Sequence, residues 1–300
     1  MNLFDSASLI VTPNAYKASK LYAIKPTDGS GDLVVTRATT ATRVNASGVI
    51  ETVSANVPRL DYTNSSCPSL LVEPQRTNLF TYSEQFDDAV WSKTFTNITA
   101  NATTSPDGTA NADKLTASTT GTDRRLQKTG TLSAGTYTTS IFVKASELNV
   151  FRMYAVDFSS QATFTLTGNG SVSNQIGSAT SIIENYVNGW YRCSMTLAFG
   201  GGSTQVMYFN LGNALGGQVI NAGEGLFVWG AQLEAGSYAT SYIPTVASAV
   251  TRNADVISKT GLTGITTITE TFEDDTTNVI GGSPTSYTMS QGRIKYVIGI

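Results

Sequence analysis

Short segments of alternating apolar and polar residues, separated by turn residues, recur through the middle of this 300-residue chain. Between residues 76 and 248 they include GTYTTSIFVKA, VFRMYAVDF, WYRCSMTLAF, TQVMYFNLG and GLFVWGAQL. A period of two places successive side chains on opposite faces of a strand, and strands at this spacing are typical of a sandwich or jelly roll. Tracts with helical periodicity are nearly absent, so the sequence predicts an all-β fold.

The alternation predicts which side chains share a face. In YTTSIFVKA, one face carries Tyr137, Thr139, Ile141 and Val143, and we expect one side to pack while the other meets water or a second sheet. In GLFVWGAQLE, we expect Phe227, Ala231 and Leu233 on one face and Gln232 and Glu234 on the other. No repeat of 20 to 50 residues is present, which disfavours a β-helix or a propeller.

The chain divides into three parts by pattern. Residues 1–75 predict an extended N-terminal arm and a hairpin, because the first 36 residues have too little periodic apolar surface to fold alone. Residues 76–250 predict the jelly-roll sandwich. Residues 251–300 predict a small β-rich segment that packs on the sandwich or intertwines with symmetry mates.

Composition excludes several classes of function. Charged residues make up 14% of the chain, with a net charge of −3 and no long basic run, which argues against a nucleic-acid partner. His is absent, so the commonest metal ligand and the usual neutral-pH base are missing. No apolar run is long enough for a membrane helix, and the N-terminus lacks the basic start of a secretory signal.

Candidate catalytic groups are sparse. Asp87 with Asp88, and the acidic run 273–275, are adjacent in sequence, so neighbouring carboxylates point to opposite faces and are interpreted as solvated turn residues. No G-x-S-x-G motif occurs. Cys67 and Cys193 make neither a disulfide framework nor a zinc site, and we expect both to be small buried side chains. The sequence therefore predicts a protein that is not an enzyme.

Four strings in the sequence carry a family resemblance: LVEPQRTNLFTYSEQFDDAVW (71–91), GLFVWGAQLEAGSYATSYIPT (225–245), RATTATRVNASGVIETVSANVPRLDY (37–62) and TRNADVISKTG (251–261). Together they resemble bacteriophage virion structural proteins, of the tail, fibre or head-decoration type, with a carbohydrate-binding-module-like jelly-roll domain. The resemblance covers most of the chain. It implies that the first two strings form the first and last strands of the sandwich.

The resemblance implies a protein of the virion, assembled in the host cytoplasm. Its expected partners are further copies of itself, as in a trimer, other virion proteins through the N-terminal arm, and a host-surface glycan. Two alternatives stay open: a purely structural capsid or neck auxiliary protein without a ligand, and a polysaccharide depolymerase. The missing repeats and the missing acid pair disfavour the depolymerase.

Carbohydrate binding needs aromatic faces and planar polar side chains. The aromatic supply consists of Trp91, Trp190, Trp229, Tyr186, Tyr191, Tyr208 and Tyr242. The predicted carbohydrate-binding residues are Trp190, Tyr191, Gln232 and Glu234. A core position for Trp190 and Trp229 is the competing interpretation, because strand aromatics are more often buried than exposed.

Calcium is the one candidate cofactor. Modules of the resembled class hold a structural calcium ion near their first and last strands, and hard oxygen ligands suit this ion. The candidate positions are Glu84, Asp107, Asp113 and Glu234, although no EF-hand spacing is present. Structural ion pairs are predicted among Arg59, Asp61, Glu73 and Arg76, where they would lock the arm to the sandwich.

Overall fold

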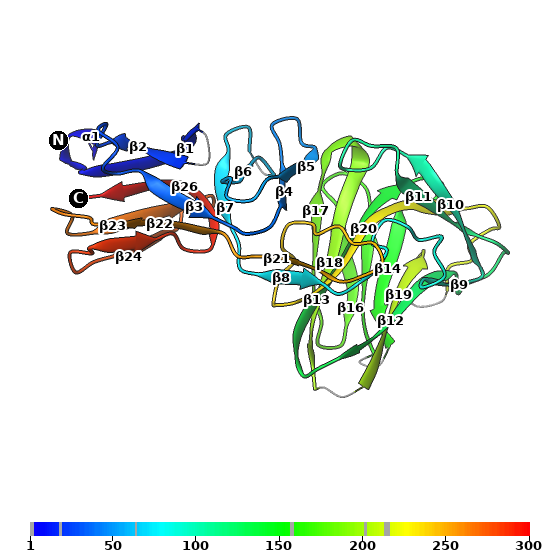
Figure 1. Cartoon of the computed structure of the whole chain (residues 1–300). Coiled ribbons are helices and arrows are strands. Elements are labelled where there is room, and N and C mark those ends of the chain that lie inside the picture. Colours follow the sequence, from blue (N-terminus) through cyan, green and yellow to red (C-terminus); the bar gives the residue numbers. More distant parts are fainter. Residues whose placement is uncertain (1–2, 18–19, 64, 157–158, 201–202, 213–216) are drawn as a thin grey trace. The chain divides into compact units, whose positions relative to one another are not determined.

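A computed structural model describes residues 3–17, 20–63, 65–156, 159–200, 203–212 and 217–300 (Figure 1). In this part the chain is 54% strand and 2% helix, with antiparallel sheets, which confirms the predicted all-β class. The chain forms two compact units. Residues 77–250 make up the sandwich unit, and residues 1–76 together with 251–300 make up the terminal unit.

The sandwich unit contains two six-stranded antiparallel sheets in its described residues. In order across the sheet, sheet I consists of β10 (Thr96–Thr103), β11 (Ala112–Ala117), β20 (Gly225–Ala235), β13 (Gly135–Ala145), β18 (Trp190–Phe199) and β17 (Thr180–Asn185). Sheet II consists of β16 (Ser171–Ile176), β15 (Ser160–Thr165), β14 (Val150–Ala155), β19 (Ser203–Leu211), β12 (Arg125–Leu132) and β9 (Ser92–Thr94). A short 3₁₀ turn, η2 (Val187–Gly189), precedes β18.

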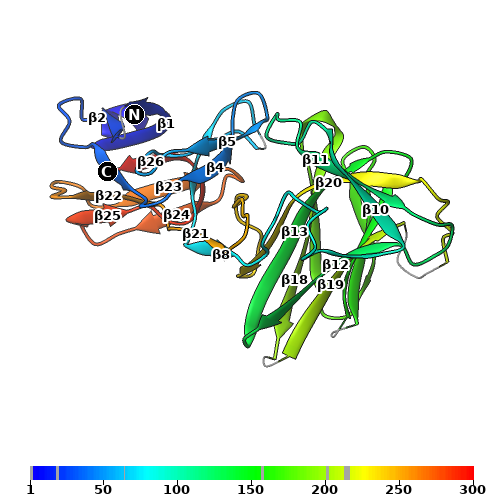
Figure 2. The same ribbon diagram turned by 45° about the vertical axis from the view of Figure 1, so that its right-hand side comes forward.

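The core of the sandwich unit lies between these two sheets (Figure 2). Ile141 and Val143 of β13 are fully buried on the face that the alternation predicts, opposite aromatic side chains of sheet II. Phe151 and Phe209 of sheet II stack with ring centroids 6.3 Å apart. This apolar interior is the main stabilising contribution to the unit, because burial of apolar area dominates folding.

The outer face of sheet I is also buried over its central strands, β20, β13 and β18. Ser140 and Phe142 of β13 have no exposed surface, because residues 77–83 and 236–246 cross over this face. Asn78 fixes the crossing: its Nδ2 donates to the carbonyl oxygens of Ala231, at 3.1 Å, and of Ile243, at 2.9 Å. Both sides of β13 are therefore packed.

One predicted strand pattern is wrong at a glycine. Gly230 interrupts β20 with φ of +62°, and the pairing of β20 with β13 shifts register there. Leu226 and Val228 before the bulge face the core, as do Ala231 and Leu233 after it. Phe227 consequently does not share a face with Ala231, because a bulge adds one residue and resets the alternation.

The terminal unit is built on a ten-stranded sheet in its described residues. The main path of the sheet runs through β24 (Thr277–Ile280), β23 (Ile268–Phe272), β26 (Gly292–Gly299), β1 (Leu9–Lys17), β2 (Lys20–Lys25), β3 (Leu33–Thr36), β22 (Val256–Thr260) and β25 (Ser286–Thr288). β7 (Ser69–Val72) pairs with β26 and with β6 (Leu60–Asp61). A hairpin, β4 (Ala41–Val44) and β5 (Ile50–Val53), and a short helix, α1 (Leu3–Ser6), complete the unit.

The first strands of the chain are thus not a separate arm. Leu9 and Val11 of β1 have no exposed surface, and β1 pairs with both β2 and the last strand, β26. The expected arm and the expected C-terminal segment share one core, because each supplies the strand partner that the other lacks. β8 (Arg76–Asn78) pairs with β21 (Val250–Arg252) where the chain passes from one unit to the other and back.

A buried charge network joins distant segments of the terminal unit. Asp255 accepts from Arg37, at 2.8 Å, and in a two-pronged contact from Arg59. Glu73 accepts from Arg59, at 2.8 Å, and from Arg252. These five side chains are at most 9% exposed. Burial lowers the pKa of Arg37, whereas for Arg59 the opposing effect of burial is outweighed by Glu73 and Asp255, which raise its pKa.

Another buried carboxylate, outside this network, links strands near the two ends of the path through the ten-stranded sheet. Glu270 of β23 has no exposed surface and accepts from the Tyr287 hydroxyl at 2.7 Å and the Ser290 amide at 2.8 Å. Asn278 of β24 donates to the same carboxylate at 2.9 Å. Burial, followed by the charge of Glu270, raises the pKa of Tyr287, so this hydroxyl stays protonated and remains a donor.

Asp255→Asn should destabilise the terminal unit by about 3–5 kcal/mol, because it leaves two buried guanidinium groups without their shared carboxylate. Hydrogen-exchange mass spectrometry of peptides from 1–76 and 251–300 measures this effect. Glu51→Gln is the control, because both side chains of the Arg43–Glu51 pair are partly exposed and its loss should cost less than about 1 kcal/mol. Equal exchange rates in the two variants would contradict this role for the network.

Gly230→Ala should destabilise the sandwich unit by about 1–3 kcal/mol, since an L-residue at positive φ is strained. The new Cβ would also lie 3.1 Å from the Phe142 ring. Gly130→Ala on β12 is the matched control, because a Cβ there meets no heavy atom within 4 Å. Urea denaturation followed by tryptophan fluorescence reports on this unit, where all three tryptophans lie. A loss of similar size in both variants would contradict the bulge argument.

Candidate functional site

The sequence-predicted carbohydrate residues are all buried. Trp190 is 1% exposed, and its indole Nε1 donates to the Thr104 carbonyl at 3.1 Å. Tyr191 lies in the core and donates to the Gly168 carbonyl at 2.8 Å. Gln232 and Glu234 have no exposed surface. The predicted ligand face of β20 is therefore an internal surface, because residues 236–246 fold back over it.

Gln232 and Glu234 hold that covering segment in place. Glu234 accepts from the Thr240 amide at 2.8 Å and from its hydroxyl at 2.6 Å. Gln232 Oε1 accepts from the Ile243 amide at 2.7 Å. These contacts fasten the ATSYIPT segment to sheet I, so the two residues serve the scaffold.

Three of the predicted calcium residues gather near the start of the sandwich unit. Glu84 accepts from Asn111 at 3.1 Å and from the Tyr242 hydroxyl at 3.0 Å. Burial raises the pKa of Glu84, and the charges of Asp107 and Asp113 add to the effect. Glu234 lies elsewhere, on β20. Among the described residues, no group of three or more His, Cys, Asp or Glu side chains has an arrangement that could hold a metal ion.

Asp113 is the most strongly perturbed carboxyl of this group. Its oxygens accept from the backbone amides of Phe86, at 2.9 Å, and Asn101, at 3.0 Å. Burial raises the pKa of Asp113 to about 6, against these two hydrogen bonds. The ionised form of the Asp113 carboxyl group at neutral pH is therefore unfavourable for the folded state.

The predicted structural ion pairs lie within the terminal unit. Arg59 and Glu73 pair in the buried charge network described above. Asp61 instead pairs with Arg293 of β26 and accepts from the Val44 amide at 3.0 Å. Arg76 donates to the neighbouring Gln75 carbonyl at 3.1 Å. Asp255 and Arg252, which are distant in sequence, complete the network. The ion pairs therefore join segments of the terminal unit and do not lock an arm to the sandwich.

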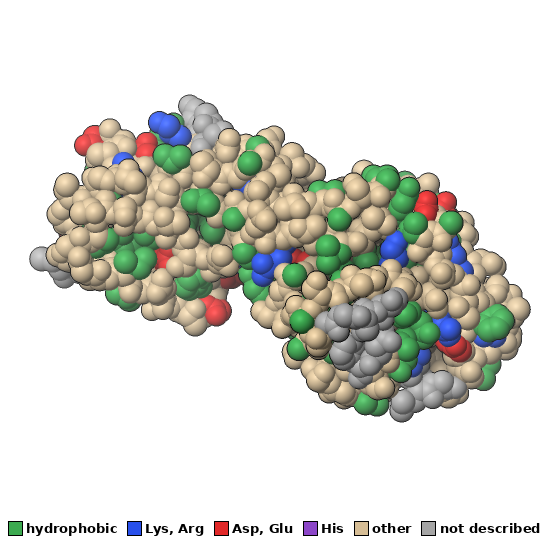
Figure 3. Space-filling view, turned by 60° about the horizontal axis from the view of Figure 1, so that its bottom comes forward, with side chains coloured by type: hydrophobic (Ala, Val, Ile, Leu, Met, Phe, Trp, Pro, Cys, Tyr) green, Lys and Arg blue, Asp and Glu red, His purple; other side chains and the backbone are tan. Residues whose placement is uncertain are grey.

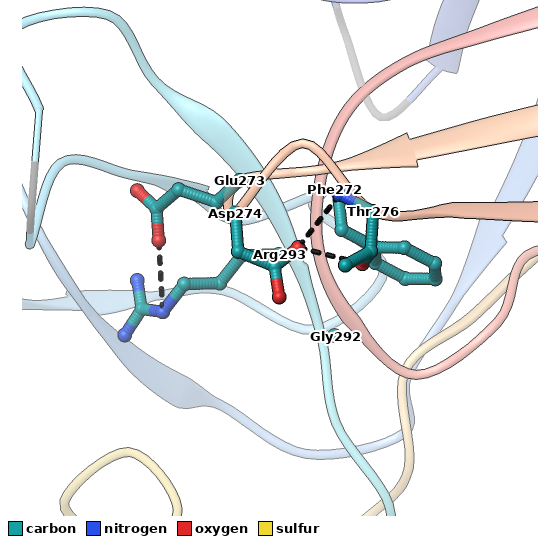
Figure 4. Close-up of a pocket in the computed structure, with 6 residues that line it drawn as sticks. All are labelled: Phe272, Glu273, Asp274, Thr276, Gly292 and Arg293. Atoms are coloured by element: carbon teal, nitrogen blue, oxygen red, sulfur yellow. Dashed lines mark hydrogen bonds and ion pairs between the residues drawn. The ribbon is translucent and has the colours of Figure 1, made fainter.

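A shallow pocket of about 640 Å³ lies beside Arg293 (Figure 4). Its lining residues are Phe272, Glu273, Asp274, Thr276, Gly292 and Arg293. Arg293 faces Glu273, with Nε and Oε2 3.7 Å apart, while Asp274 accepts from the Thr276 hydroxyl at 2.6 Å. These polar groups are engaged with protein neighbours, so we assign the pocket no ligand.

A different surface brings together groups that suit a saccharide. Tyr154 of β14 and Tyr208 of β19 are directly paired on the outward face of sheet II, with ring centroids 5.8 Å apart. Both rings are partly exposed. Gln127 of β12 and Gln161 of β15 flank them and complete one row across four strands.

A second row runs parallel to the tyrosine row, two residues along the strands. It consists of Arg125 on β12, Asn210 on β19, Arg152 on β14 and Thr163 on β15. We call these two rows the tyrosine face. At a strand spacing of about 4.8 Å, four strands give the face a width of roughly 14 Å, the scale of a short oligosaccharide.

The arginines of the tyrosine face are held against its rings. The Arg125 guanidinium lies 4.2 Å from the centroid of the Tyr208 ring, and the Arg152 guanidinium lies 5.3 Å from that of Tyr154. Arg152 Nη1 also donates to Gln161 Oε1 at 3.1 Å. Burial, followed by the charge of Arg125, lowers the pKa of Arg152. The face therefore combines apolar rings with oriented donors.

Charged side chains are sparse on the visible molecular surface, which consists mostly of backbone and of hydroxyl and amide side chains (Figure 3). Of the eight residues of the tyrosine face, two are charged, Arg125 and Arg152, and four are amide or hydroxyl side chains other than tyrosine. The alternation of VFRMYA places Arg152 and Tyr154 on one side of β14, and that of QVMYFNL does the same for Tyr208 and Asn210. This alternation is the only signal of the tyrosine face in the sequence. It does not reveal the face, because the sequence alone does not say that β14 and β19 are adjacent.

The stability of the sandwich unit should fall as the pH rises from about 4 to about 6, because Asp113 has a raised pKa in the folded state and ionises earlier in the unfolded chain. Asp113→Asn should flatten this dependence. Melting curves followed by tryptophan fluorescence at each pH measure it. Glu224→Gln is the control, since the pKa of Glu224 is lowered in the folded state. A steep fall that persists in Asp113→Asn would contradict the assignment.

No helix in the described part of the chain is long and apolar enough to cross a membrane. No protein-family model matches the chain, and no curated protein matches it. The geometry of the candidate site is therefore the main guide to function.

Proposed function

We propose that this chain is a bacteriophage virion structural protein, of the tail, fibre or head-decoration kind, that binds host-surface carbohydrate through the tyrosine face of sheet II. The observation that carries the adhesive part is the direct pairing of Tyr154 with Tyr208 beside two arginines and three amide side chains. The sequence resemblance supports the virion part.

The chemistry of the tyrosine face suits a sugar ring. A pyranose has an apolar C–H surface, which packs against aromatic carbon, and a rim of hydroxyls, which need planar donors and acceptors. Tyr154 and Tyr208 supply the aromatic carbon. Arg125, Arg152 and the amides of Gln127 and Gln161 supply the polar rim in the same two rows.

The virion context supplies the strength that a single site lacks. A small, partly exposed face binds a saccharide weakly, roughly in the millimolar to micromolar range, and several copies on one particle multiply that affinity. A homo-oligomer such as a trimer, assembled in the host cytoplasm and mounted on the virion, presents the face in this way. Other virion proteins are its further partners.

The segments that carry the resemblance also support a scaffold role. Arg59, Glu73 and Asp255 come from three of those segments and meet in the buried charge network. Asn78 and Ile243 come from the first and last strings of the sandwich and are hydrogen-bonded to each other. The strings that carry the resemblance therefore include residues that stabilise the terminal unit and the sandwich unit.

The purified chain, fluorescently labelled and clustered to mimic a multivalent particle, should bind a subset of an array of bacterial surface polysaccharides. The double variant Tyr154→Ala with Tyr208→Ala should lose at least about tenfold in signal, because the apolar contact surface is gone. Tyr238→Ala is the matched control, since Tyr238 is an exposed tyrosine outside this face.

Mass spectrometry of purified phage particles tests the virion part independently. The chain should copurify with particles at constant stoichiometry. If it does so while the wild-type protein binds no glycan, the role of a capsid or neck auxiliary without a ligand replaces adhesion. If it is absent from particles, the virion assignment fails.

A further inference from the structure

Asn210 and Thr163 form the buried floor of the tyrosine face. Asn210 is 2% exposed and lies between Arg125 and Arg152 in its row. Thr163 is 3% exposed and lies on the other side of Arg152. Among the described residues, Asn210 Oδ1 and Thr163 Oγ1 have no hydrogen-bond partner. Buried polar atoms are nearly always hydrogen-bonded, so two such atoms on one face indicate that a bound group completes them.

The neighbouring Asp123 fixes the orientation of the Asn210 amide. Asn210 Nδ2 donates to Asp123 Oδ1 at 3.3 Å. A carboxylate accepts hydrogen bonds, so the nitrogen of the amide must face Asp123 and the oxygen must face away from it. Asp123 is itself held by an ion pair with Arg125. Asn210 therefore presents an acceptor, and not a donor, to a ligand.

The row alternates hydrogen-bonding character across the sheet. Arg125 and Arg152 are pure donors, and Asn210 Oδ1 between them is a pure acceptor. A hydroxyl satisfies both kinds of neighbour, because it accepts from a guanidinium and donates to Oδ1 at the same time. A carboxylate, a sulfate or a phosphodiester cannot donate, and over Asn210 it would face both Oδ1 and the charge of Asp123.

We propose that Asn210, oriented by Asp123, makes the tyrosine face selective for uncharged saccharides that place a free hydroxyl over Asn210 Oδ1. The inference rests on the proposed function and names its ligand class. Thr163 supplies a second hydroxyl contact in the same row. Asn210 is the specificity-determining residue, and Asp123 is a positioning residue that acts through it.

Binding requires the arginine side chains to move. Asn210 is covered by its long neighbours, and Arg125 and Arg152 lie over the rings of Tyr208 and Tyr154. Arginine side chains have several rotatable bonds. A saccharide that packs on a tyrosine ring can therefore displace the guanidinium from the ring toward the hydroxyls of the saccharide. The displaced guanidinium then donates to the ligand.

Calorimetric titration tests the selectivity. The probes are neutral trisaccharides of gluco, galacto and manno configuration and the uronic-acid trisaccharides of the same configurations. Wild-type protein should prefer a neutral probe over its uronic partner by about tenfold or more. Asn210→Leu should lose about tenfold in affinity for that neutral probe. Its melting temperature should be unchanged or higher, because an apolar group replaces an unpaired buried oxygen.

Two further variants separate positioning from packing. Asp123→Asn frees the Asn210 amide to rotate, so the preference for neutral over uronic probes should fall toward one. Thr163→Val should weaken neutral binding severalfold, and Thr165→Val, on the same strand outside the two rows, is the matched control that should not.

The outcomes distinguish this inference from the proposed function. Wild-type affinity in Asn210→Leu, or a preference for uronic probes, would overturn the role of Asn210. The saccharide site itself would stay in place if Tyr154→Ala with Tyr208→Ala still weakens binding at least about tenfold. Absence of binding to every probe and to the polysaccharide array would remove the proposed adhesive function itself.

Discussion

Burial of the central strands of sheet I on their outer face is the constraint on which the location of the candidate site depends. The segments that enter and leave the sandwich unit cross this face, and Asn78, Gln232 and Glu234 fasten them to it through hydrogen bonds to backbone groups. The central strands of sheet I, β20, β13 and β18, are consequently packed on both sides. The partly exposed aromatic and polar rows lie on sheet II, where Tyr154 and Tyr208 are paired.

The terminal unit combines an apolar core with a buried charge network. Asp255 and Glu73 each bind two arginines, and backbone carbonyls take up further guanidinium donors, as with Arg37 and Ser54 at 2.6 Å. Such a network contributes specificity of pairing among distant segments as much as stability, since a buried charge tolerates few alternative partners. Together with the β1–β26 pairing and the shared apolar core, it joins segments from both chain ends in one unit.

The tyrosine face combines an apolar contact surface with a strict hydrogen-bonding pattern. The rings of Tyr154 and Tyr208 give affinity without selectivity, because any pyranose has a C–H surface. Selectivity resides in the neighbouring row, where Asp123 sets the direction of the Asn210 amide. In the proposed virion, many copies would turn this weak but selective contact into firm adhesion.

Local patterns in the sequence determined the all-β class and most strand positions, because strand alternation depends only on neighbouring residues. They also marked Arg59, Asp61 and Glu73 as ion-pairing residues, but the structure decided that Arg59 pairs with Glu73 and Asp61 with Arg293. The sequence did not reveal that Trp190, Tyr191, Gln232 and Glu234 are covered, that Gly230 resets the β20 face, or that β1 pairs with β26. Tertiary structure decided these points and the tyrosine face, because they depend on which strands become neighbours across long sequence separations and on which sheet face the connecting segments cover.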